Sequence, residues 1–322
     1  MIGIIAKLFV VAAALTPLLL SSPAAAAPAQ VAYVSSTGSD NDNTCTTVAQ
    51  PCATVGQAVV EISGTSGGVV SCINGTGPIN DTGGSELPYS FELTIDCPGG
   101  TFLGDGVNQF DLLLTGANQT LKIRHLTFDL ANTASGASAI LFQGSGNLIL
   151  EDCVFENGSG VALNITPNGP LTLVIKNSRI SNNTAAGVLI KPASGGSVTA
   201  TFDGVTITNN AGGLHTDTTN GAVRVDISNS TISNNADNGL AIIGGAGGAN
   251  MVTVKNGVIA SNGQAGIEAS GFNAAVLVNN AVLDSNTGGA LSAVSSGRIV
   301  TYQNNTVIGS PGSGFTGTAA PQ

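Results

Sequence analysis

The sequence contains no tryptophan, and aromatic residues make up only 4% of its 322 residues. Clefts that bind sugar rings commonly stack aromatic side chains against them, so this composition disfavours a deep saccharide groove. Charged residues are also scarce, at 9%, and the formal net charge is −10. Because an acidic surface repels a phosphate backbone, no nucleic-acid partner is expected.

The sequence has five cysteines but no Cys-x-x-Cys motif and no Cys/His cluster, which excludes an ordinary zinc site. Five cysteines fit an oxidising compartment. Cys45 and Cys52 can close a small loop, whereas Cys72 and Cys97 lie one repeat apart, where stacked strands bring Cα atoms within disulfide range. We therefore predict the disulfides Cys45–Cys52 and Cys72–Cys97, and we interpret Cys153 as a small buried side chain.

Long apolar runs are confined to the start of the chain. Residues 1–27 have the pattern of a secretory signal peptide. A basic N-terminal region is followed by the apolar run Leu8–Leu20 and then by small residues of the kind found at cleavage sites. The run is shorter than the ~20 residues of a membrane-spanning helix, and no later segment could span. We expect cleavage of this peptide and a secreted or periplasmic mature chain.

The chain does contain one short sequence motif that is repeated seven times at steps of 24 to 27 residues. The seven copies of the motif end at Phe155, Ile180, Ile207, Ile232, Ile259, Leu283 and Ile308. A period of this size indicates a solenoid with one coil per repeat. Each repeat also alternates apolar residues, as in Leu171, Leu173 and Ile175, which predicts short strands. The expected fold is an all-β parallel β-helix of about ten coils, with three strands per coil.

Asparagine recurs at two positions of each repeat, which we interpret as structural columns at the turns. Asn side chains satisfy turn backbone groups, tolerate the left-handed region and can bond to the Asn of the next coil. The first column is predicted to contain Asn177, Asn229, Asn256, Asn280 and Asn305. The second is predicted to contain Asn183, Asn210, Asn235, Asn262 and Asn286. His125 takes the place of the turn Asn in its own coil.

The chain divides into four expected parts. After the signal peptide, residues 28–62 form an N-terminal cap with a short strand and an amphipathic helix over 53–62 that covers the first coil. Residues 63–309 form the solenoid, and the Gly- and Pro-rich residues 310–322 form a flexible tail. Outward charges alternate in sign from coil to coil, as in Arg124, Glu151 and Lys176, which favours register rather than a site.

Four segments carry a resemblance: Tyr33–Asp40, Pro51–Thr54, Ile95–Cys97 and coils such as Asn177–Asn183. In them the chain resembles bacterial secreted right-handed parallel β-helix repeat proteins of the pectin-lyase-like superfamily. The resemblance covers nearly all of the chain after the signal peptide and implies a right-handed coil. Members include pectate lyases, polygalacturonases, tailspike hydrolases and surface proteins without known chemistry, so the fold alone does not name a reaction.

The catalytic strings of that superfamily are missing. Polygalacturonase-like members carry Asn-Thr-Asp, Asp-Asp, Gly-His-Gly and Arg-Ile-Lys, and none of these strings occurs here. Pectate-lyase-like members hold calcium in a nest of carboxylates beside a basic residue. Because the carboxylates of this chain are scattered singly, we expect no metal and no cofactor.

The remaining candidates for catalysis are His215, Asp217, Arg224 and Asp226, which follow one another in neighbouring strands. A histidine beside carboxylates can act as a general acid or base, and the simpler interpretation is a set of solvent-facing polar side chains. We predict a non-catalytic protein with a structural, adhesive or glycan-surface-binding role at the bacterial envelope. The alternative is a polysaccharide lyase or glycoside hydrolase with an unrecognised active site. A polysaccharide or cell-surface glycan is the expected partner.

Overall fold

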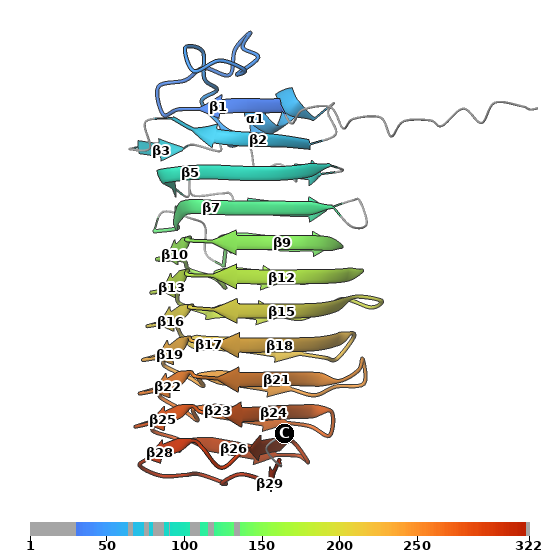
Figure 1. Ribbon diagram of the computed structural model, residues 1–322, viewed down its shortest axis with the longest axis vertical. Helices are drawn as coiled ribbons and strands as arrows, with labels where there is room; N and C mark the ends of the chain where they lie inside the picture. Colours follow the sequence, from blue (N-terminus) through green and yellow to red (C-terminus); the bar gives the residue numbers. More distant parts are fainter. Residues whose placement is uncertain are drawn as a thin grey trace, which may run out of the picture.

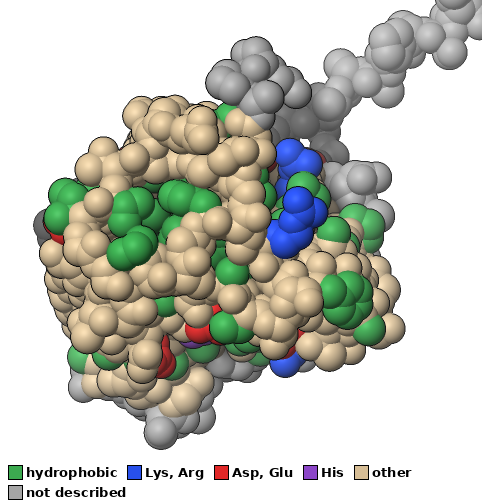
Figure 2. Space-filling view, turned by 90° about the horizontal axis from the view of Figure 1, so that it is seen from below, with side chains coloured by type: hydrophobic (Ala, Val, Ile, Leu, Met, Phe, Trp, Pro, Cys, Tyr) green, Lys and Arg blue, Asp and Glu red, His purple; other side chains and the backbone are tan. Residues whose placement is uncertain are grey.

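The repeats form the turns of a parallel β-solenoid, whose strands stack along the long axis of a rod (Figure 1). The structure is a computed structural model that describes residues 30–63, 67–73, 77–79, 87–89, 91–103, 110–114, 119–131 and 136–319. The predicted signal peptide, residues 1–27, lies outside these ranges. Within them, no helix is long and apolar enough to cross a membrane. Seen from the C-terminal end, charged side chains are sparse (Figure 2).

Each coil contributes strands to three faces of the rod. The first face contains β1 (Gln30–Val34), β2 (Gly67–Cys72), β5 (Glu92–Leu103), β7 (Thr120–Asp129), β9 (Gly146–Glu151), β12 (Pro170–Lys176), β15 (Ser197–Asp203), β18 (Ala222–Ser228), β21 (Asn250–Lys255), β24 (Ala274–Asn279), β27 (Arg298–Thr301) and β29 (Gly317–Thr318). The second face contains the ends of β5 and β7 with β3 (Gly77–Ile79), β10 (Val154–Glu156), β13 (Arg179–Ser181), β16 (Thr206–Thr208), β19 (Thr231–Ser233), β22 (Val258–Ala260), β25 (Val282–Asp284) and β28 (Thr306–Ile308).

Among the described residues, the third face is a separate sheet of nine strands, slightly fewer than the ten or so coils that the repeat length predicts. Its strands are β4 (Leu87–Tyr89), β6 (Phe110–Leu114), β8 (Ile140–Gly144), β11 (Leu163–Ile165), β14 (Ala186–Ile190), β17 (Gly212–Asp217), β20 (Leu240–Ile243), β23 (Ile267–Ser270) and β26 (Leu291–Val294). The count is lower because the chain enters through a helix and leaves through a tail rather than through complete coils.

The core runs along the axis of the rod and is built from stacked apolar columns. On the second face, one inward column contains Phe102, Phe128, Phe155, Ile180, Ile207, Ile232, Ile259, Leu283 and Val307. The rings of Phe128 and Phe155 stack with centroids 4.9 Å apart. Inward and outward residues alternate along each strand, so this register keeps one face of every strand buried.

A helix and a disulfide-closed loop cover the N-terminal end. Helix α1 (Val55–Ile62) begins at Thr54, whose side chain accepts a hydrogen bond from the backbone N–H of Gln57. Its buried face packs against β1 and β2, and a side chain at Gly68 would collide with Ile62. The helix thus packs on the first strands of the solenoid, and it begins two residues later than the predicted range of 53–62.

The second asparagine column is a buried ladder. Asn183, Asn210, Asn235, Asn262 and Asn286 are all buried. In each of the first four, Nδ2 donates to Oδ1 of the Asn in the next coil, at 2.8 to 3.1 Å. The same Oδ1 also accepts from the backbone N–H of the previous Asn. Each amide therefore satisfies turn groups in two coils.

The first column lies on the surface and includes one correction. Asn177, Asn229, Asn256 and Asn280 all have positive φ values, from 47° to 51°. In the last coil, Asn304 and not the predicted Asn305 lies opposite Asn280, because Thr306 pairs with Val282, and the positive φ of this turn falls on Gln303. A shift of one residue exchanges the two faces of a strand. The seventh copy of the motif therefore ends at Val307 rather than at Ile308.

The C-terminal tail differs from the flexible segment that its composition predicts. Strand β29 pairs with β27, and Phe315 packs against the core. The backbone N–H of Thr316 donates to the carbonyl of Ile299 at 2.7 Å, and that of Ala319 to Thr301 at 2.8 Å. Residues 310–319 therefore cover the last coil, because the open end of a solenoid leaves strand edges and core side chains to be satisfied.

Candidate functional site

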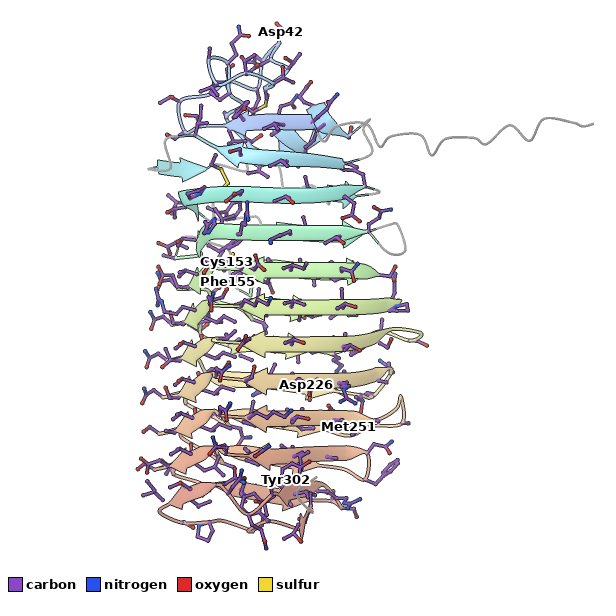
Figure 3. All side chains as sticks on the ribbon, in the orientation of Figure 1. Asp42, Cys153, Phe155, Asp226, Met251 and Tyr302 are labelled. Atoms are coloured by element: carbon purple, nitrogen blue, oxygen red, sulfur yellow. A yellow bond between two sulfur atoms is a disulfide. The ribbon has the colours of Figure 1, made fainter. Side chains whose placement is uncertain are left out.

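The four residues proposed from the sequence lie on two different faces. His215 and Asp217 occupy the partly exposed positions of β17 on the third face, where they alternate with the buried residues Leu214 and Thr216. Arg224 and Asp226 point outward from β18 on the first face, where Figure 3 labels Asp226. The two strands belong to separate sheets. The structure therefore places these four side chains on two faces rather than in one site.

The side chain of His215 lies on the outer surface of β17, but the tip of its ring packs against the protein. Its Nε2 atom is buried, has no partner among the described residues, and lies against the backbone of Gly212. Burial lowers the pKa of His215, and the charges of Asp237 and Glu268 oppose that shift. The imidazole is therefore neutral near pH 7, with the nitrogen that a general base would use directed away from solvent.

The other three candidates are held in ion pairs. Lys191 Nζ lies 3.0 Å from Asp217 Oδ2 across adjacent coils, and Thr219 donates two hydrogen bonds to Asp217 Oδ1. Burial raises the pKa of Asp217, but these hydrogen bonds outweigh it and leave that pKa below its ordinary value. On the other face, Arg224 Nε and Asp226 Oδ2 are 3.8 Å apart. The Lys191–Asp217 pair can help to hold two coils in register, and the Arg224–Asp226 pair lies within one strand.

A denser group of charges lies at the corner between the first and second faces. It consists of six residues from β5, β7 and β9 with their turns, which we call the corner cluster: Asp96, Lys122, Arg124, His125, Glu151 and Asp152. Figure 3 labels Cys153, which directly follows Asp152. The positive φ values of His125 (56°) and Asp152 (53°) put both residues in the column that asparagine fills in later coils. The repeat therefore positions these two side chains.

His125 bridges two carboxylates in the corner cluster. Its Nδ1 lies 2.8 Å from Asp96 Oδ1, and its Nε2 lies 3.7 Å from Asp152 Oδ2. Arg124 Nη2 also pairs with Asp96, at 2.7 Å from Oδ2. An imidazole oriented by one carboxylate and facing a second can accept or pass on a proton. The sequence places His125 in a turn column but does not show that Asp96 and Asp152 flank it.

Lys122 and Glu151 form the other part of the corner cluster. Lys122 Nζ lies 2.6 Å from Glu151 Oε2. The hydrogen bond from Lys122 lowers the pKa of Glu151 below its ordinary value, against the opposing effect of burial. Glu151 is therefore ionised at neutral pH and paired, which leaves it unsuited to donate a proton to a leaving group.

No metal centre emerges from the described part of the chain, in which no three His, Cys, Asp or Glu side chains are grouped to hold an ion. The cysteines form the two predicted disulfides, Cys45–Cys52 and Cys72–Cys97. Cys153 is buried and free, and burial raises the pKa of its thiol to about 12. A thiol this difficult to ionise is a structural residue rather than a nucleophile.

Parallel strands stacked on three faces define a parallel β-solenoid. Two overlapping stretches, residues 108–226 and 164–320, match the family described as "Right handed beta helix region". Together they cover more than half of the chain, and the chain therefore belongs to the right-handed β-helix family. A comparison with curated protein sequences gives no match.

Among solved structures, the chain is similar to the one titled "Crystal structure of pectate lyase Pel9A". The two have a TM-score of 0.52 and 14% sequence identity over 90% of this chain and 78% of that chain. At this identity the similarity shows the fold alone.

Proposed function

We propose that this protein is an extracellular, non-catalytic β-helix protein with a structural or adhesive role, and that its surface binds glycans at the bacterial envelope. The observation that carries the proposal is the state of the four catalytic candidates. His215 directs its Nε2 into the protein, Asp217 is held by Lys191, and Arg224 and Asp226 pair with each other on another face. Of these contacts, only the Lys191–Asp217 pair joins adjacent coils, whereas Arg224 and Asp226 lie on the same strand.

Three observations support an extracellular glycan partner. The two disulfides suit an oxidising environment. The similar solved structure is titled a pectate lyase, and the sequence begins with a signal-peptide pattern. The net charge of −10 opposes binding of acidic polymers, so neutral glycans suit this protein better than polyuronates.

The test is a combined binding and turnover screen of the purified mature chain, together with fractionation of the producing cells. Insoluble neutral and acidic polysaccharides are mixed with the protein, and both the bound fraction and the released ends are measured. We expect binding to a neutral polysaccharide, extracytoplasmic location and no new reducing or unsaturated ends. Sustained release of such ends would refute the non-catalytic role, and a purely cytoplasmic location would refute the extracellular one.

The corner cluster favours a second candidate function, a polysaccharide lyase or glycoside hydrolase. It rests on the geometry of His125 between Asp96 and Asp152 rather than on His215. If glycan turnover is found, His125→Ala should abolish it without lowering the melting temperature by more than a few degrees. His215→Ala is the matched control on the third face. If His215→Ala abolished activity and His125→Ala did not, the active site would instead lie at His215.

A further inference from the structure

The cap loop, residues 35–54, contains a second polar site that is separate from the faces of the rod. It follows β1 and projects beyond the first coil, with Asp42 at its outer end (Figure 3). The Cys45–Cys52 disulfide closes the loop, and both cysteines are fully buried. The N–H of Tyr33 donates to the carbonyl of Cys45 at 2.7 Å, and the N–H of Cys52 to the carbonyl of Tyr33 at 2.8 Å. The loop is thereby fixed to β1.

Two side chains fix the backbone of the loop itself. Asp40 Oδ1 accepts a hydrogen bond from the N–H of Thr54 at 3.1 Å. Asn43 Nδ2 donates to the carbonyl oxygens of Ser39 and Pro51, both at 2.8 Å. The walls of the loop are therefore set before any ligand arrives, which reduces the entropy lost on binding.

These contacts surround an open pocket of about 260 Å³. Its polar lining residues are Thr37, Ser39, Asn41, Asp42, Asn43 and Gln50. None of the residues lining the pocket is basic or aromatic. The side chains of Asn41, Asp42 and Gln50 have no hydrogen-bond partner within the described part of the chain. Asp42 also adopts a φ of 49°, a region that residues other than glycine rarely occupy.

Free amides beside a free carboxylate match the hydroxyl groups of a sugar, each of which both donates and accepts. A uronic acid carries a carboxylate that Asp42 would repel. Calcium prefers six to eight oxygen ligands, whereas Asp42 is the one carboxylate lining the pocket. The volume lies just below the roughly 300–1,000 Å³ of ordinary ligand pockets, which leaves room for one or two sugar units.

We propose that the cap-loop pocket binds one or two units of a neutral glycan at the N-terminal tip of the rod. This inference deepens the proposed function and rests on its glycan-binding part. The carboxylate of Asp42 accepts hydrogen bonds from two adjacent hydroxyls, and the amides of Asn41 and Gln50 bond to the remaining ones. The site thus recognises uncharged sugars.

Ligand-observed NMR on the full mature chain tests the proposal with methyl glycosides of neutral hexoses and of the corresponding uronic acids. We expect a Kd on the order of millimolar for a neutral glycoside, because small polar ligands gain little affinity per atom, and binding at least tenfold weaker for the uronic acid. Asp42→Asn should weaken binding about tenfold, since it removes charge-assisted hydrogen bonds. Gln50→Ala should weaken it less. Asp284→Asn, at the other end of the rod, is the control and should change nothing.

The outcomes separate this pocket from the proposed function. If Asp42→Asn binds as the unchanged chain does, the pocket assignment is wrong and glycan binding elsewhere on the rod stands. If polysaccharides bind but no soluble glycoside does, the pocket assignment is also wrong. If neither binds, the glycan role itself is lost. If the pocket binds Ca²⁺ but no glycoside, and this binding depends on Asp42, the pocket is a cation site rather than a sugar site.

Discussion

The N-terminal coils, up to Asp129, and the later coils from Gly146 onward form the same three-faced solenoid but hold their corners differently. In the later coils, side-chain amides recur at the turns of most coils, and the strand register continues without interruption as far as β25 (Val282–Asp284). In the early coils, the register of β5 against β7 shifts between Asp96 and Gly100. A disulfide and ion pairs surround that irregularity. One coil geometry thus tolerates two kinds of corner chemistry.

The difference follows from what each side chain can satisfy. A buried Asn supplies both a donor and an acceptor, so a column of them leaves no turn group unpaired. Cys72 and Cys97 cannot do this, but their covalent bond joins adjacent coils directly. The neighbouring ion pairs satisfy charges at an exposed corner, where water supplies the remaining hydrogen bonds. The amide ladder therefore suits long regular arrays, and the covalent link suits an interrupted one.

The strongest test of this comparison removes one rung of the buried ladder. In Asn235→Leu, the backbone N–H and the Nδ2 of Asn210 both lose the acceptor Asn235 Oδ1 inside the protein. Buried groups left unsatisfied cost about 1–3 kcal/mol each, so we expect a loss of about 4 kcal/mol in the free energy of unfolding. Urea denaturation followed by circular dichroism measures it.

The matched control is Asn256→Gly in the exposed column, where Asn280 Nδ2 donates to Asn256 Oδ1 at 2.8 Å and glycine keeps the φ of 51° without steric strain. Water can replace that bond, so the loss should stay below about 1 kcal/mol. Equal losses at the two positions would show that burial does not distinguish the columns.

The next test removes the covalent corner of the early coils. Cys72→Ser with Cys97→Ser opens a link across 25 residues, whereas Cys45→Ser with Cys52→Ser opens one across 7. The loop-entropy relation gives about 3.5 kcal/mol for the longer link and about 2.4 kcal/mol for the shorter one. Thermal unfolding of both variants and the unchanged chain measures the order. A larger effect at the shorter link would mean that the cap loop, not the corner, limits stability.

The sequence predicted the fold from features that repeat. Columns such as Phe155, Ile180 and Ile207 could be read because a fixed period places equivalent residues on equivalent strands. The prediction failed by one residue at the last coil. Both Val307 and Ile308 are apolar and both Asn304 and Asn305 are amides, so the pattern alone fits either register.

The candidate site was harder to predict because it depends on side-chain direction. The sequence shows that His215 and Glu268 share a column, but not that Nε2 of His215 faces Gly212. The corner cluster was missed because a register shift lies between Asp96 and the end of its strand. The pocket at Asp42 was missed because a turn-rich loop carries no periodicity.

The smallest expected effect concerns the Lys122–Glu151 pair at the corner. Because the folded-state pKa of Glu151 is lowered, its pairing stabilises the folded chain fully above the ordinary value of 4.5, and this contribution is lost as the pH falls through the lowered pKa. Because both side chains are partly exposed to water, the pair contributes only about 0.5 kcal/mol to the free energy of unfolding. Glu151→Gln should therefore lower the urea midpoint at pH 6 and leave it nearly unchanged near pH 3. Glu92→Gln, an exposed carboxylate on the same face, is the control. A difference that persists unchanged at pH 3 would mean that packing of the Glu151 stem, not its charge, stabilises this corner.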